Sequence, residues 1–182
     1  CVVAGCQNTA IGSLALRGSE TITGNCNTAI GMNAMRDISA GVCRTVAVGN
    51  GALYNFESNN TVAVGTCAGA NTTTANTNTY VGHFAAYTNT TGAYNTVMGR
   101  SVFYNNTTGS CNVAIGTDAM TNVKENGNTA DSNIAIGSIA MKGGTLAGDF
   151  IGNIAIGRYA MDATDTNAQT GTIAIGHQSL TA

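Results

Sequence analysis

The sequence predicts an all-β protein, a parallel β-solenoid in which ten short coils stack on one another. The first observation is a motif of the form Asn/Thr-x-Ala-Ile/Val-Gly that returns ten times in 182 residues, with small variations. The second is the spacing of 16 to 21 residues between successive motif glycines. That spacing suffices for one solenoid turn with short strands, whereas helical repeats need about 33 residues or more. The third is the alternation of β-branched residues before each glycine, which is typical of strands.

Within each repeat the four residues before the glycine form the expected strand, and the glycine itself the turn that leaves it. We call this residue the anchor glycine, because only a residue without Cβ tolerates a positive φ or a close backbone approach at such a turn. Three residues later stands Ala in eight of ten copies, usually followed by Leu, Met or Phe, and a variable connector closes the coil. The ten anchor glycines are Gly12, Gly31, Gly49, Gly65, Gly82, Gly99, Gly116, Gly137, Gly157 and Gly176.

The two faces of each strand carry different side chains. In the first repeat Thr9 and Ile11 point to one side and Asn8 and Ala10 to the other, since side chains alternate along a strand. We expect the Ile/Val side to form the core of each coil. We expect the small alanines to pack against another copy of the chain around a symmetry axis, and the asparagines at the strand entry to stack into a ladder of amides.

Composition excludes several classes of partner. Only 9% of the residues are charged, and 7 Lys and Arg against 9 Asp and Glu give a net charge of −2. A chain of this kind has no basic surface for nucleic acid. No run of 18 apolar residues is present, so membrane insertion is not expected. We interpret residues 1–182 as a single solenoid domain that belongs to a longer fibre chain.

The runs "NTAIGSLAL", "NTAIGMNAM" and "NIAIGRYAM" resemble the SVAIG-type repeats in the head domains of trimeric autotransporter adhesins, and similar runs in bacteriophage tail fibres. The resemblance covers essentially the whole chain. It implies a left-handed parallel β-roll, intertwined as a homotrimer and displayed outside a cell or on a virion. The implied function is attachment to a host or neighbouring surface, through a glycan or protein receptor. A purely structural spacer and a monomeric ice-binding solenoid are the alternatives.

Candidate binding residues are the aromatic side chains expected at the surface, Tyr87, Tyr94 and Tyr104. Exposed aromatic rings are good platforms for sugars and protein anchors. The longest connector, residues 121–132, adds Lys124 and Glu125, because long loops on rigid scaffolds commonly carry recognition.

The remaining chemistry-bearing residues give weaker predictions. Cys26 and Cys43 fall near one column on adjacent coils, so they are the best pair for a disulfide, and small buried hydrophobic residues are the alternative. No CxxC pair indicates a metal, no cofactor motif is present, and the nine carboxylates are scattered. We therefore expect neither an enzyme nor a cofactor.

Overall fold

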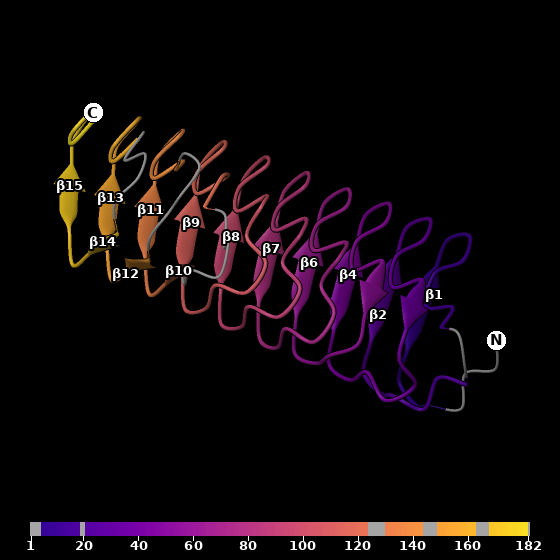
Figure 1. Ribbon diagram of the computed structural model, residues 1–182. Coiled ribbons are helices and arrows are strands. Elements are labelled where there is room, and N and C mark those ends of the chain that lie inside the picture. Colours follow the sequence, from indigo (N-terminus) through magenta and orange to yellow (C-terminus); the bar gives the residue numbers. More distant parts are fainter. Residues whose placement is uncertain (1–4, 19–20, 124–129, 144–148, 163–167, 182) are drawn as a thin grey trace.

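The structure, a computed structural model, describes residues 5–18, 21–123, 130–143, 149–162 and 168–181, and within these ranges it contains strands and turns but no helix. Each of the ten repeats contributes one three-residue strand to a ten-stranded parallel sheet, which we call the main sheet (Figure 1). Its strands are β1 (Thr9–Ile11), β2 (Thr28–Ile30), β4 (Val46–Val48), β6 (Val62–Val64), β7 (Thr79–Val81), β8 (Thr96–Met98), β9 (Val113–Ile115), β11 (Ile134–Ile136), β13 (Ile154–Ile156) and β15 (Ile173–Ile175). The predicted parallel β-solenoid is confirmed.

Five two-residue strands lie in the connectors that return the chain to the main sheet. Two of them, β3 (Asp37–Ile38) and β5 (Asn55–Phe56), pair in parallel near the N-terminal end. Three others, β10 (Ala130–Asp131), β12 (Phe150–Ile151) and β14 (Gln169–Thr170), form a parallel sheet near the C-terminal end. The coils stack in chain order, so the two termini lie at opposite ends of the solenoid (Figure 1).

The anchor glycines occupy the turn that leaves each main-sheet strand, as predicted. Their φ angles lie between 124° and 138°, a region that side-chain-bearing residues rarely adopt. A Cβ added at Gly31 would lie 2.6 Å from the carbonyl oxygen of Gly49 in the next coil. Both the backbone conformation and the close stacking of coils therefore require glycine here.

The faces of the main-sheet strands are reversed relative to the sequence prediction. In the strands from β2 to β13 the alanines, among them Ala29 and Ala63, are fully buried inside the coil, whereas Val62 and Val64 on the other side are 37% and 36% exposed. The expected Ile/Val core and the expected alanine interface between copies are thus both wrong. The physical reason is the narrow coil: larger side chains such as Met35 already fill its interior, so only alanine fits opposite them.

The asparagines at the strand entries form the expected ladder of amides, here inside the coil, in seven of the ten repeats; Thr45, Thr61 and Thr172 take their place in the other three. Asn133 N and Nδ2 donate to Asn112 Oδ1 at 2.9 and 3.1 Å, and Asn153 repeats both bonds to Asn133 at 3.0 Å. Each amide also reaches across the coil to a connector carbonyl, as Asn133 Nδ2 does to Phe150 O at 2.7 Å. These buried polar groups are satisfied along the stack, which fixes the register of successive coils.

Candidate functional site

Two surface features stand out, and the first is the outer face of the main sheet. We call it the Ile/Val face and define it by the residues one and three positions before each anchor glycine. All of them are partly or fully exposed, and Ile173 reaches 66%. The face consists of Thr9, Ile11, Thr28, Ile30, Val46, Val48, Val62, Val64, Thr79, Val81, Thr96, Met98, Val113, Ile115, Ile134, Ile136, Ile154, Ile156, Ile173 and Ile175. Since none of these residues is charged, the strip is a continuous, mainly apolar surface from β1 to β15.

The second feature is a column of side chains five positions after the anchor glycines, where the chain leaves the turn. Inter-coil hydrogen bonds keep this column in register. Asn55 N donates to Ala70 O at 2.9 Å, and Asn71 N donates to Tyr87 O at 3.1 Å. The column therefore reads, in successive coils, Arg36, Tyr54, Ala70, Tyr87 and Tyr104.

At one end of the column two tyrosines stack face to face. The rings of Tyr87 and Tyr104 are nearly parallel, 12° apart, with centroids separated by 5.1 Å. The Phe84 ring meets Tyr87 edge-on at 5.3 Å and Tyr104 edge-on at 5.9 Å. This support holds one face of Tyr87 against Tyr104 and leaves the other face directed toward the coil of Ala70.

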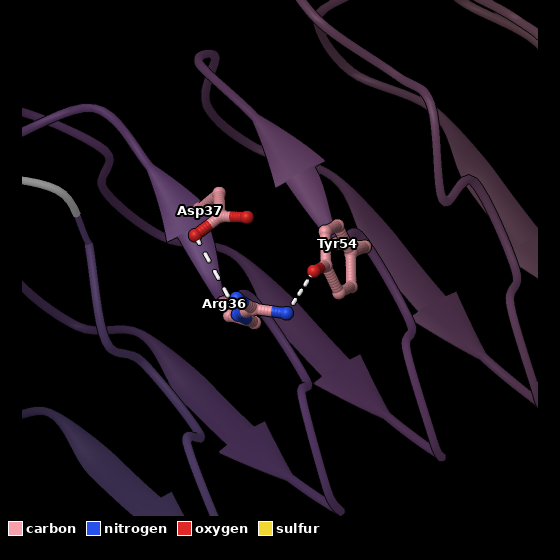
Figure 2. A network of polar contacts seen from close by, with 3 residues as sticks. All are labelled: Arg36, Asp37 and Tyr54. Atoms are coloured by element: carbon pink, nitrogen blue, oxygen red, sulfur yellow. Dashed lines mark hydrogen bonds and ion pairs between the residues drawn. The ribbon is translucent and has the colours of Figure 1, made fainter.

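At the other end Arg36 contacts the hydroxyl end of the Tyr54 ring. The guanidinium carbon of Arg36 lies 5.0 Å from the Tyr54 ring centroid, and its Nη1 donates a hydrogen bond to the Tyr54 hydroxyl (Figure 2). Asp37 Oδ1 lies 3.7 Å from Arg36 Nε, which balances the guanidinium charge.

Ala70, whose side chain is small, leaves an open groove between these two tyrosines, which we call the tyrosine slot. Its volume is about 330 Å³, within the range of small-molecule sites. The lining residues are Asn33, Asn50, Gly51, Tyr54, Asn55, Cys67, Ala70, Asn71 and Tyr87. Burial raises the pKa of the Cys67 thiol above its ordinary value, so the lining carries no charge near neutral pH.

A second groove of about 370 Å³ adjoins the slot and shares Asn55 with it. Its lining includes the carboxylates of Asp37 and Glu57, along with Ser39 and Thr73. The neutral slot is therefore bordered by an acidic groove on the same side of the solenoid.

The predicted binding residues fall into three groups. Tyr87 and Tyr104 come together, and Tyr87 lines the slot. Tyr94 is 64% exposed but precedes its strand, in a different column, and makes no ring contact with either. Lys124 and Glu125 lie outside the described residues.

Tyr54 and Arg36 are not among the binding residues predicted from the sequence, although the repeats contain a signal for both. Each stands five residues after its anchor glycine, the same offset as Tyr87 and Tyr104. Aligning the ten repeats on their glycines, rather than searching for aromatic density along the chain, places all four residues in one column.

The predicted Cys26–Cys43 disulfide is not formed, since both thiols are free. Cys26 Sγ donates to Gln7 Oε1 at 3.1 Å, and Cys43 Sγ to Gly41 O at 3.3 Å. The reason is register: relative to its anchor glycine, Cys43 lies one residue earlier than Cys26. The two thiols therefore occupy neighbouring columns that face different ways. The alternative of a buried hydrophobic residue does not describe Cys26 either, which is exposed.

Neither metal nor ice chemistry has support in the described part of the chain. No group of three or more His, Cys, Asp or Glu side chains that could hold a metal ion occurs among the described residues. Threonines do align in the connectors, but Thr73 and Thr90 donate their hydroxyls to backbone carbonyls of the next coil at 3.0 and 2.9 Å. Those hydroxyls are therefore not arranged as a free array.

Comparisons of the chain with family models, with curated proteins and with solved structures found no match. Among the residues the structure describes, no helix is long and apolar enough to cross a membrane.

Proposed function

We propose that this chain is a segment of an extended homotrimeric fibre that attaches to a host or neighbouring surface, with the left-handed winding typical of β-roll heads. The observation that carries the proposal is the Ile/Val face. A strip of β-branched side chains along ten consecutive strands is far larger than the scattered apolar residues that monomers expose, and such strips usually mark association sites.

The partner that fits this face is a second and third copy of the chain. The face repeats with the coil spacing of the main sheet, so an identical face offers the same spacing and the same side chains. Cyclic packing of three copies around one axis keeps all N-termini at one end, which lets the fibre continue in both directions. The interface is then made by the Ile/Val face and not by the alanines.

The stacked coils supply the length and stiffness that a fibre needs. Ten strands at the spacing of a parallel sheet give a rod of roughly 45 Å. Side-chain amides and backbone bonds link every pair of neighbouring coils in the main sheet, as at Asn112 and Asn133. No catalytic role is part of the proposal.

The test is the molar mass of the folded chain by light scattering, with two lysine variants. We expect three times the chain mass of 18.3 kDa for the native protein. Ile136→Lys, on the face, is expected to give single folded chains, because assembly would bury a charge at a cost of several kcal/mol. Thr117→Lys, exposed in a turn one residue after its anchor glycine, is the matched control and should leave the mass unchanged.

Two results would contradict the proposal. A native mass of one chain would contradict the homotrimeric fibre. A trimeric Ile136→Lys variant would show that the interface does not lie on the Ile/Val face. Circular dichroism of each variant verifies that the solenoid is folded.

A further inference from the structure

We infer that the tyrosine slot binds one pyranose ring of a neutral glycan. This inference names the ligand class for the attachment role proposed above and rests on that role. The slot is built within a single chain, so its binding can be measured whether or not the chain assembles.

Aromatic side chains stand on both sides of the slot. Tyr104 covers one face of Tyr87, so the uncovered face of Tyr87 is directed toward Ala70, and Tyr54 lines the other side of the slot. The C–H groups of a sugar ring carry partial positive charge and pack on the negative face of an aromatic ring. The open face of Tyr87 can therefore hold one side of a sugar ring.

The width of the slot suits a sugar ring. Tyr54 and Tyr87 stand two coils apart, so their attachment points are separated by about 9 to 10 Å. A flat heteroaromatic ring between them needs only about 7 Å, at contact distances of about 3.5 Å on each side. A pyranose chair is thicker than a flat ring, because its hydrogens project above and below the mean plane, and it fills the wider gap better.

The polar lining of the slot suits a sugar as well. Four asparagine side chains, Asn33, Asn50, Asn55 and Asn71, surround the slot. Amides both donate and accept, which suits hydroxyl groups.

The charge of the site selects uncharged sugars. Arg36 is already engaged by Asp37 and the Tyr54 hydroxyl, and the adjoining groove carries the Asp37 and Glu57 carboxylates (Figure 2). Acidic sugars or phosphates would approach these carboxylates without a free cation to pair with in the slot lining. A longer neutral oligosaccharide can extend past Asn55 into the second groove.

The experiment is saturation-transfer difference NMR on the full 182-residue chain. The probes are the methyl pyranosides of glucose, galactose, mannose and N-acetylglucosamine, with adenosine as a flat-ring comparison. We expect transfer to the ring C–H protons of at least one pyranoside at roughly millimolar concentration, as befits one small ring. We expect none to adenosine.

Three variants assign the signal to the slot. Tyr87→Ala removes one ring face and is expected to weaken binding at least about tenfold. Ala70→Leu fills the gap between the tyrosines without removing any aromatic or polar group, and is expected to abolish binding in a folded chain. Tyr94→Ala, an exposed tyrosine in another column, is the control and should bind like the native chain.

Three results would overturn the inference: no transfer to any pyranoside, transfer to adenosine alone, or transfer that survives in both Tyr87→Ala and Ala70→Leu. These failures differ from failure of the fibre proposal. If the protein binds a sugar but has the mass of one chain, the inference about the slot stands and the fibre proposal fails. If the protein is a trimer but binds no sugar, the fibre proposal stands, with this segment as a spacer, and the inference about the slot fails.

Discussion

Tyr80 occupies the strand position that is alanine in most repeats, and its ring is completely buried. Its hydroxyl accepts a hydrogen bond from Asn89 Nδ2 at 2.5 Å, and Asn89 also binds the backbone of Gly92 through both amide atoms. In the next coil Asn106 Nδ2 lies 3.4 Å from Asn89 Oδ1. In the central coils these polar side chains replace part of the apolar core. Nearer the N-terminal end, the apolar residues Ile38 and Phe56 hold the positions equivalent to Asn89 and Asn106.

Burial gives this tyrosine a distinctive pH dependence. Desolvation raises the pKa of Tyr80 well above its ordinary value, although the hydrogen bond from Asn89 opposes the shift. The unfolded chain then loses its Tyr80 proton first, near pH 10. The stabilising contribution of the buried, neutral hydroxyl is therefore present below about pH 10 and is lost as the pH rises beyond it.

We predict that Tyr80→Phe lowers the free energy of unfolding by about 1 kcal/mol at pH 7, because Asn89 loses one partner. The loss of stability above about pH 10 should be smaller in the variant than in the native chain. Urea unfolding at a series of pH values measures both effects. Equal alkaline slopes for the two proteins would show that Tyr80 does not titrate as a buried group.

At the scale of the element, the turn after each main-sheet strand has two left-handed positions, two and four residues after the anchor glycine. Even Ile139, a β-branched residue, adopts φ 61° there, and Met35 adopts φ 49°. The backbone amides still bond to the neighbouring coil, as Asn33 N does to Ser13 O at 2.9 Å. The inter-coil ladder therefore imposes a conformation that most of these side chains disfavour.

This strain predicts a stabilising glycine substitution. Ser101 has φ 51° and lies in the column where Gly51 stands. Ser101→Gly therefore relieves the backbone strain of the folded chain, while it raises the conformational entropy of the unfolded chain, which opposes part of the gain. We expect the free energy of unfolding to rise by about 0.5 kcal/mol. Thr117→Gly, a turn position without a positive φ, should instead lower it by about 0.5 to 1 kcal/mol. If both variants are destabilised alike in denaturant melts, the left-handed turn is not strained.

The sequence predicts the order of elements but not which strand face points inward. Gly31 and its equivalents mark the turns correctly, because a glycine that returns at a regular spacing indicates the same turn in every coil of a solenoid. Period-two alternation, however, is the same whichever side is buried. That choice depends on the width of the coil, which connector side chains such as Ile38 and Phe56 help to set.

The tyrosine slot is equally hidden from a reading along the chain. Tyr54 and Tyr87 lie 33 residues apart, and what brings them together is the stacking of coils of unequal length. The slot also depends on a residue without a large side chain, Ala70, which attracts no attention in a sequence. Alignment of the repeats recovers the column, but the open volume requires the structure.

At the scale of the whole molecule the solenoid has three surfaces of different character: the Ile/Val face, the side with the tyrosine slot, and the stack ends at β1 and β15. Among the described residues the β15 end is uncapped, since its anchor glycine, Gly176, has no backbone within 4 Å of an added Cβ, and at the β1 end Ile11 is 59% exposed. Open strand edges can also pair with other chains. Side-by-side assembly through the face and end-to-end stacking through the edges are therefore the two arrangements to separate.

Small-angle X-ray scattering of the native chain separates them most directly, because the forward intensity gives mass and the distance distribution gives length. The account predicts three chain masses in a particle whose length remains roughly 45 Å, that of one rod. A particle of one chain mass would contradict it, as would three chain masses in a particle two or three rods long.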